Sequence, residues 1–316
     1  MRTLIAGATG AVGQRLVPML LDEGHEVVAM TRTEAKAGHL RELGAMPVVA
    51  DALDLDAVMG AVRGAEPDVI VHQLTALTGA TDMKHFDRVF ATTNRLRTEG
   101  LRNLLDAGRA AGTRRIIVQS YTGWPFAREG GAVKDEDAPL DTDPPKAQRE
   151  SLAAIRELED MVTHARATHG IEGVVLRYGG FYGPGTSMST RGDITDLIAK
   201  RRLPIIGDGG GVWSFTHIDD AARAVVATLE PGGPQGIFAI VDDEPVRVAD
   251  WIPAFAEAIG AKPPRRVPAW LGKLAAGEVA VTMMTASRGA SNARARRVLG
   301  FEPRWPSWRV GFREGL

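Results

Sequence analysis

Thr3-Leu4-Ile5-Ala6-Gly7-Ala8-Thr9-Gly10-Ala11-Val12-Gly13 stands near the start of the chain, and a helical stretch from Gln14 to Glu23 follows it directly. A short apolar strand, a Gly-x-x-Gly-x-x-Gly turn and a helix place backbone N–H groups and the positive helix end where a pyrophosphate can bind. Gly7 permits the tight turn, Gly10 lets phosphates approach the backbone, and Gly13 lets the helix pack closely on the sheet. The stretch therefore predicts a dinucleotide site whose contacts include Gly7, Thr9, Gly10, Ala11, Val12 and Gly13.

Apolar segments alternate with helical patterns through the first 180 residues, which is typical of an α/β fold with a doubly wound parallel (Rossmann) sheet. A chain of 316 residues exceeds the usual size of one domain, so we expect a smaller C-terminal substrate lobe as well. We predict that residues 1–180 form the dinucleotide-binding domain, that residues 213–245 return to it, and that residues 181–316 mainly form the lobe. The predicted strands are 3–6, 26–30, 46–50, 69–72, 115–120 and 173–177, and a helix, with a break, is expected from residue 82 to about residue 111.

The composition limits the classes of partner. A formal net charge of -1 gives no reason to expect binding to nucleic acid or to an anionic membrane. No apolar run approaches the length of a membrane span and no leader is visible, so we expect a cytoplasmic protein with a small-molecule substrate, a homodimer being one option. The chain has no cysteine, and His164 and His169 are five residues apart, so no metal site is predicted.

The residues after the second strand favour NADP. An acidic residue there usually binds the ribose hydroxyl of NAD, whereas arginine accommodates the 2′-phosphate of NADP. Here Arg32 offers a planar guanidinium that matches a phosphate, and Arg15 is a candidate to join it. Glu34 nearby keeps NAD open. The ends of the third and fourth strands add further predicted cofactor contacts, namely Asp51 and Ala52 at the adenine and Gln73, Leu74 and Thr75 beside the phosphates and ribose.

Several longer segments carry a resemblance to a known family. They are the glycine turn, Ile116-Ile117-Val118-Gln119-Ser120, Leu176-Arg177-Tyr178-Gly179-Gly180-Phe181-Tyr182-Gly183-Pro184-Gly185, Phe215-Thr216-His217-Ile218-Asp219-Asp220-Ala221 and the tail from Asn292 to Pro303. With these segments the chain resembles the extended short-chain dehydrogenases/reductases of the NAD-dependent epimerase/dehydratase group. The resemblance implies that Tyr178, Gly179 and Gly180 lie against the nicotinamide, and that His217 bonds backbone near a helix start capped by Asp219.

The resemblance also implies a Tyr-x-x-x-Lys pair, which this chain lacks. In the family the lysine lowers the pKa of the tyrosine and holds the nicotinamide ribose. None of the three tyrosines here has a lysine four residues later. Alignment on the Glu159 end of the helix puts Ser151 in the place of the tyrosine and Ile155 in that of the lysine, and a second segment aligns Arg97 with the family's structural asparagine. General acid–base catalysis is worth about 10²- to 10⁴-fold, so its loss demands another proton donor, a slow reaction or no reaction.

The residues after the fifth strand are the candidate replacements. We predict that Tyr121, Ser120 and Thr122 polarise the substrate, and that Trp124, Phe181 and Trp213 bind it. Trp213 stands where sugar-nucleotide members of the family carry arginine, which favours an apolar substrate over a diphosphate. Residues 123–145 are expected to form a long surface loop, with a substrate-side flap as the alternative.

These residues predict an NADP(H)-dependent oxidoreductase that acts on a small, fairly apolar carbonyl or alcohol. Two other hypotheses stay open. One is a non-catalytic dinucleotide-binding sensor or scaffold, and the other is an epimerase or dehydratase with a recruited base.

Overall fold

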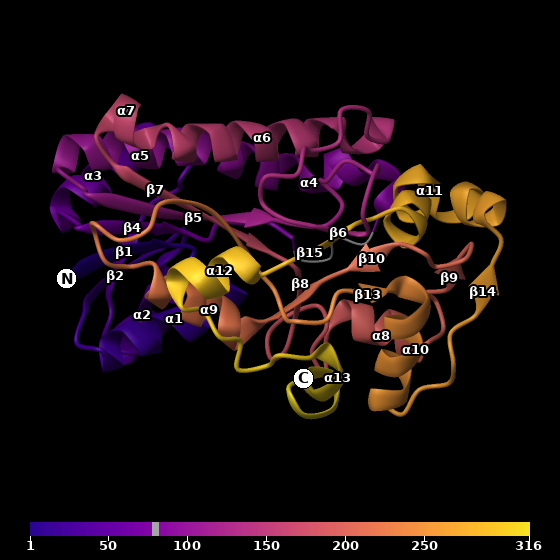
Figure 1. Cartoon of the computed structure of the whole chain (residues 1–316). Helices are drawn as coiled ribbons and strands as arrows, with labels where there is room; N and C mark the ends of the chain where they lie inside the picture. Colours follow the sequence, from indigo (N-terminus) through magenta and orange to yellow (C-terminus); the bar gives the residue numbers. More distant parts are fainter. Residues whose placement is uncertain (78–81) are drawn as a thin grey trace.

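The chain folds around one parallel sheet of seven strands, in the order β12-β7-β5-β4-β1-β2-β3 (Figure 1). The structure is a computed structural model that describes residues 1–77 and 82–316. The strand order reverses between β1 and β4, which is the switch point of a Rossmann sheet. The strands are β1 (Arg2–Ala6), β2 (Glu26–Thr31), β3 (Met46–Val49), β4 (Val69–His72), β5 (Arg115–Tyr121), β7 (Glu172–Tyr178) and β12 (Gly236–Ile240).

Helices cover both faces of this sheet, as the doubly wound prediction requires (Figure 1). The side chains of β1 alternate, because Ile5 packs into the apolar core on one face and Leu4 into the core on the other. One face carries α1 (Ala11–Asp22), α2 (Glu34–Glu42), α9 (Ile218–Ala227) and α12 (Ala293–Leu299). The other carries α3 (Leu55–Ala65), α4 (Phe86–Arg95), η2 (Leu96–Gly100), α5 (Leu101–Ala111), α6 (Arg149–Thr163) and α7 (Ala165–His169).

The predicted strands match the observed ones to within one residue at each end. The predicted break in the long crossover is a turn of π-helix, η2, that joins α4 to α5 without interrupting the helical backbone. A short 3-10 turn, η1 (Met83–His85), precedes α4. Such π-turns are frequent at functional sites, and this one lies where β4 ends, because Nε2 of His72 bonds to the carbonyl of Leu96 at 3.0 Å.

A second apolar core, centred on Trp251, Phe255 and Phe312, lies beyond the carboxyl edge of the sheet. The predicted division at residue 180 stays a prediction, although β12 and α9 do pack on the N-terminal sheet. The elements of this region are α8 (Asp193–Ala199), α10 (Val248–Ala258), α11 (Ala269–Thr285), α13 (Trp308–Glu314), and the short strands β8 (Gly180–Tyr182), β9 (Ile205–Ile206), β10 (Val212–Trp213), β11 (Phe215–His217), β13 (Val246–Arg247) and β14 (Arg266–Val267).

The expected surface loop at 123–145 is more structured than predicted. Its short strand β6 (Val133–Lys134) pairs with β15 (Gly289–Ala290), and Phe126 forms a bridge to Leu140. Phe126 is only 2% exposed and packs under the guanidinium of Arg177, 5.6 Å from the ring centre. The sequence of this segment predicts a surface loop because acidic residues dominate it. Its few apolar residues, among them Phe126 and Leu140, nevertheless hold it against the protein. In the described part of the chain no helix is long and apolar enough to cross a membrane.

The approach of α6 to β7 depends on Gly173. A Cβ atom added there would lie 1.9 Å from the backbone oxygen of Val162, which cannot move independently of the helix. We expect Gly173→Ala to lower the free energy of unfolding by about 2 to 3 kcal/mol through overpacking. Gly60 lies on the exposed side of α3 and has nothing within 4 Å of its added Cβ. Gly60→Ala should therefore raise the free energy of unfolding by about 0.5 to 1 kcal/mol. Urea denaturation measures both, and equal effects would contradict the packing argument.

Candidate active site

The glycine turn after β1 is built by close backbone contacts. Gly7 has a φ of +100°, and a Cβ there would lie 2.7 Å from the backbone oxygen of Gln73. At Gly13 a Cβ would lie 2.3 Å from the oxygen of Gly7 and 2.5 Å from that of Ala8. Gly10 caps the start of α1, is exposed, and has only one atom within 3.3 Å of an added Cβ. Gly7 and Gly13 are thus required by the protein itself, whereas Gly10 leaves its outer side open to a ligand.

Gln73 is the strongest sign that this turn holds a polar group. Its side chain is 4% exposed, and neither its amide nitrogen nor its amide oxygen has a hydrogen-bond partner. A buried amide without partners costs about 1 to 3 kcal/mol, so such groups are usually paired by water or a ligand. Leu74 and Thr75 follow it, half-buried, along the same edge. These residues fit a dinucleotide on the glycine turn, because the open side of Gly10 would accept its phosphates and the amide of Gln73 has unused capacity for its hydroxyl groups.

Arg32 lies exposed just beyond β2 and makes no ion pair with the described residues. Glu34, the residue that kept NAD open, pairs instead with Arg41 at 2.8 Å. Arg15 does not join Arg32, because its Nε lies 3.3 Å from a carboxylate oxygen of Asp219 on α9. The suggestion that Arg15 joins Arg32 at a phosphate stays a prediction, and it requires Arg15 to leave Asp219.

Asp51 and Ala52 follow β3 at the same edge. Asp51 is exposed and its Oδ1 accepts from the N–H of Leu53 at 3.0 Å, which leaves Oδ2 free of bonds to described residues. Ala52 is buried, and its backbone oxygen accepts from Asn103 at 2.9 Å. Asp51 is exposed, as expected of a residue that bonds a ligand, and Ala52 is buried, as expected of a residue that packs beneath one.

A narrow cavity lies where β5 ends, against β10 and the end of α11. Its volume is about 10 Å³, room for about one water molecule, and its lining residues are Tyr121, Thr122, Gly123, Trp124, Val212, Trp213, Ser214, Met283 and Ser287. The lining therefore includes two of the residues predicted to polarise the substrate, Tyr121 and Thr122, and two of those predicted to bind it, Trp124 and Trp213. None of the lining side chains is charged, and the indole N–H of Trp213 is already donated to the carbonyl of Met283 at 2.9 Å.

Tyr121 and Thr122 differ in what they offer this cavity. Burial raises the pKa of Tyr121 to about 12. No lysine lines the cavity to oppose this shift, so the phenol stays protonated and is a weak acid. Thr122 is 2% exposed, and its hydroxyl has no partner. Thr122 is therefore the better hydrogen-bond donor to a substrate, because its hydroxyl has no competing bond.

Ser120 and Phe181 are placed away from this cavity. The hydroxyl of Ser120 is buried and donates to Oε1 of Glu159 at 2.7 Å, which commits it to the interior. Phe181 packs on the ring of Tyr178, 5.1 Å between ring centres, and joins the core beside α1 and α9. Ser120 thus supports the sheet under the site, and neither residue is among those that line the cavity.

The turn after β7 has little free donor capacity. The N–H of Gly179 donates to the hydroxyl of Thr216 and that of Gly180 to the carbonyl of Ser214, both at 2.9 Å. Tyr178 is fully buried and donates its hydroxyl to the carbonyl of Ala221 at 3.2 Å. These residues shape the edge beside the cavity, but their N–H groups are already used by the protein.

His217 has the backbone role that the resemblance implied, with one correction. Its Nδ1 accepts from the N–H of Asp219 at 3.1 Å, so His217 itself caps α9 and Asp219 does not. Its Nε2 bonds to the carbonyl of Gly315 at 2.9 Å. Burial lowers the pKa of His217, which favours the neutral ring that these two bonds require.

The two positions that align with the missing pair are fully buried on α6. Ser151 donates its hydroxyl to Asp87 at 2.6 Å and accepts from Asn94 at 3.0 Å, and Ile155 is a core residue. Both bonds of the Ser151 hydroxyl are made to side chains of α4, so it joins α6 to α4 and the position is structural. No cluster of three or more metal-ligating side chains occurs among residues 1–77 and 82–316.

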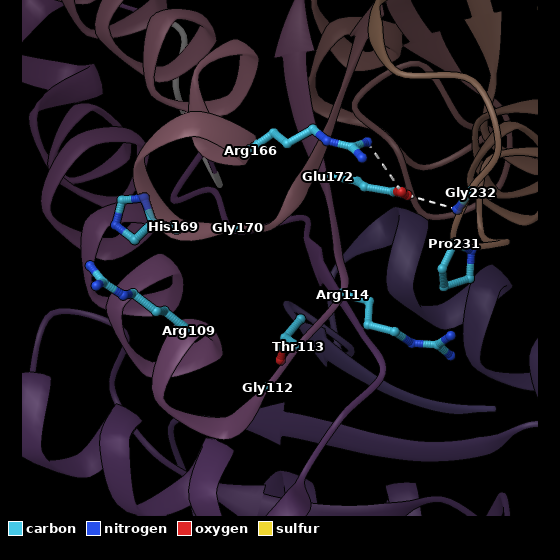
Figure 2. A pocket seen from close by; sticks show the side chains of 10 residues that line it. All are labelled: Arg109, Gly112, Thr113, Arg114, Arg166, His169, Gly170, Glu172, Pro231 and Gly232. Carbon is cyan, nitrogen blue, oxygen red and sulfur yellow. Dashed lines mark hydrogen bonds and ion pairs between the residues drawn. The ribbon is translucent and has the colours of Figure 1, made fainter.

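A larger cavity, of about 490 Å³, lies at the opposite edge of the sheet (Figure 2). Figure 2 shows Arg166 reaching Glu172, which also accepts from the N–H of Gly232 at 2.8 Å. Its lining comes from the amino ends of β5 and β7. Ligands of doubly wound sheets bind at the carboxyl ends of the strands, so the smaller cavity is the candidate active site.

Comparisons with known proteins agree with this geometry. The family model described as the NAD dependent epimerase/dehydratase family matches residues 3–240. The chain belongs to this family. Its members in the comparison include the 3-diazoavenalumate denitrifying reductase of a Streptomyces species, 44% identical over 312 residues that cover 98% of this chain and 99% of the relative. The UDP-glucose 4-epimerase of Mycolicibacterium smegmatis is 26% identical over 331 residues, covering 100% and 96%.

Solved structures of the epimerase/dehydratase family share the fold. A UDP-glucose 4-epimerase of Thermotoga maritima, crystallised with UDP-glucose, matches with a TM-score of 0.75 and 20% identity, over 99% of this chain and 96% of that one. The protein is thus an NAD(P)-dependent enzyme of the oxidoreductase or epimerase/dehydratase type. Its cofactor is a dinucleotide of the NAD(P) kind.

Sequence reasoning missed two parts of the site. Ser287 and Val212 line the cavity, but each lies in a short segment whose pairing depends on residues far along the chain. Met283 lines the cavity as well. Met283 and Ser287 could have been found only from their place in the fold, because the end of α11 returns to the edge of the sheet.

The open side of Gly10 can be tested directly. Gly10→Ala adds a Cβ whose nearest neighbour is 3.3 Å away, so the protein should fold normally. A methyl group at the phosphate-facing side should nevertheless weaken NADPH binding at least about tenfold, or about 1.4 kcal/mol. Fluorescence titration with NADPH measures this, and thermal melting of the free protein is the control. Unchanged affinity in a folded variant would show that the phosphates bind elsewhere.

Proposed function

We propose that the protein is an NADPH-dependent reductase that replaces the diazo group of an aromatic substrate by hydrogen and releases dinitrogen. The observation that carries this proposal is an aromatic, uncharged cavity next to the dinucleotide edge, in a chain without an acid–base pair. The name of the Streptomyces relative, a denitrifying reductase of a diazo acid, supports the choice of substrate.

The chemistry explains why no proton donor is needed. NADPH supplies a hydride when bound. An aryl diazonium ion accepts that hydride at its terminal nitrogen and becomes a neutral aryl diazene. The C–N bond of the diazene then breaks and dinitrogen leaves, while the N–H hydrogen moves as a proton to the ring carbon, which keeps the electron pair of the broken bond. The step is balanced by the hydride alone, whereas reduction of a carbonyl group also requires a proton on oxygen.

The residues that line the cavity suit a cationic aromatic group, which enters only when they move apart, because the cavity itself has room for about one water molecule. Tyr121, Trp124 and Trp213 present aromatic rings, which attract cations and pack on other rings. No lysine or arginine lines the cavity to repel a diazonium ion. The hydroxyl of Thr122 is free to bond an oxygen of the substrate next to the reacting group. The carbonyl or alcohol substrate expected from the sequence fits less well, because the pKa of Tyr121 is too high for an efficient proton donor.

The test uses a pair of matched probes. An ortho-diazophenol that carries a carboxylate should be converted to the phenol with consumption of NADPH and release of dinitrogen. With NADPH deuterated at the transferred position, deuterium should appear on the ring carbon. The matched ortho-hydroxybenzaldehyde should react at least about 100-fold more slowly, because general acid catalysis of about that size is missing. Faster reduction of the aldehyde would favour a carbonyl reductase, and NADPH binding without turnover of either probe would favour a sensor.

The pH profile separates Tyr121 from a proton-transfer role. Because burial raises its pKa to about 12, the phenol stays protonated and its charge does not change across the usual assay range. We expect kcat/KM for the diazo probe to be flat from about pH 6 to about pH 9 in the absence of other titrating groups in the cavity. Tyr121→Phe should keep that flat profile and lose less than about tenfold in rate. A basic limb that disappears in Tyr121→Phe would contradict the proposal.

NADP is proposed as the natural cofactor because Arg32 lies exposed beyond β2 without a carboxylate partner among the described residues. Arg32→Ala should weaken NADPH binding about tenfold or more, since a charge-assisted bond to phosphate is worth about 1.5 to 3 kcal/mol. NADH affinity should change less than about twofold. Arg41→Ala, which removes the exposed arginine paired with Glu34, is the matched control. Equal loss for NADPH and NADH in Arg32→Ala would remove the basis for NADP.

A further inference from the structure

Arg97 is a buried cation without a counter-ion. It lies in η2 with 6% of its surface exposed, and its Nη1 has no hydrogen-bond partner. No ion pair joins it to any residue in 1–77 or 82–316. Burial lowers its pKa to about 10, so it remains charged at neutral pH. A buried charge without a partner is expensive, and proteins normally keep one only where a ligand uses it.

The nearby charges do not neutralise Arg97. Glu159 is the carboxylate close enough to affect it, but both of its oxygens are bound by Arg177, at 2.8 Å and 2.7 Å. Ser120 adds a third bond to the same carboxylate. Burial lowers the pKa of His72, so this ring stays neutral beside Arg97 and offers it no negative charge. Two buried arginines therefore share one carboxylate, and Arg97 is the surplus cation.

The helix pairing places Arg97 opposite the position that lacks a lysine. Ser151, Ile155 and Glu159 are spaced four residues apart on α6 and therefore form one stripe on its buried face. Asn94 of α4 bonds to Ser151 at 3.0 Å, and Arg97, one turn further along, is electrostatically coupled to Glu159. Arg97 thus faces the part of the stripe that contains Ile155.

The order of the strands shows which half of a dinucleotide lies near Arg97. Arg32 and Asp51 follow β2 and β3, on one side of the switch point, and mark the adenine half. His72 at the end of β4 and Ser120 near the end of β5 are on the other side. Arg97 belongs with this second group, because its neighbour Leu96 accepts a bond from His72 and Arg97 acts on the charge of His72, and it does not line the cavity itself.

We propose that Arg97 binds the sugar hydroxyls on the nicotinamide side of the dinucleotide, and so supplies from η2 the cation that Ile155 cannot supply from α6. The inference rests on the dinucleotide-dependent function proposed above. An arginine presents several N–H donors in a rigid plane, which suits two adjacent hydroxyl groups. Because Arg97 is not among the residues that line the cavity, its charge does not face the substrate proposed there.

Ligand binding tests this role without any turnover. Arg97→Met should weaken NADPH binding about 10- to 100-fold, the range for hydrogen bonds to a charged group. Affinity for 2′-phospho-ADP, which lacks the nicotinamide ribose, should change less than about twofold. Arg97→Lys should recover part of the NADPH affinity. Arg95→Met, which removes an exposed arginine of the same helical run that pairs with Glu99, should change neither.

Thermal melting separates ligand binding from a structural role. Because Arg97 is an uncompensated buried charge, Arg97→Met should keep or raise the melting temperature of the free protein while reducing the increase that NADPH produces. Equal loss of NADPH and 2′-phospho-ADP affinity, or a lower melting temperature of both Arg97→Met and Arg97→Lys, would contradict the proposal. These readouts do not depend on the substrate, so failure of the diazo assay would leave the role of Arg97 standing.

Discussion

The contact between the glycine turn and the end of β4 is the constraint on which the rest of the site depends. Gly7 and Gly13 have no space for a Cβ atom, because the backbone of Gln73 and the turn itself occupy it. This contact lies at the point where the strand order reverses, so it holds the turn, the start of α1 and the amide of Gln73 in one fixed arrangement. A preorganised cradle loses little entropy when a ligand binds, which favours affinity.

The other half of the site departs from the family pattern in a consistent way. The tyrosine position holds Ser151, whose hydroxyl is bonded to Asp87, and the lysine position holds a core isoleucine. The hydroxyl groups that line the cavity are those of Tyr121, whose pKa is high, and of Thr122, Ser214 and Ser287. Such a site can bind and orient a substrate, but it has no group tuned to move a proton near neutral pH. Hydride acceptors that need no proton therefore fit it better than carbonyl groups do.

Much of the fold could be predicted because its signals are local. The apolar strands and the glycine turn each carry their own pattern, and the cofactor residues follow from the strand ends. The kinked helix α11 could not be assigned, because Gly277 at a φ of +88° interrupts its pattern. The burial of Arg97 and the bond from Ser120 to Glu159 depend on contacts between distant segments. Adjacent residues such as Ser120 and Tyr121 point to opposite faces of a strand, so only one of them meets the cavity.

The central claim, that hydride transfer here proceeds without a side-chain proton donor, is tested most directly by a pair of isotope effects on one reaction. NADPH deuterated at the transferred position should slow single-turnover conversion of the diazo probe, while the same reaction in heavy water should run at an unchanged rate. A clear solvent isotope effect on the hydride step, lost in Tyr121→Phe or Thr122→Val, would contradict the claim and restore a proton-donating residue to the mechanism.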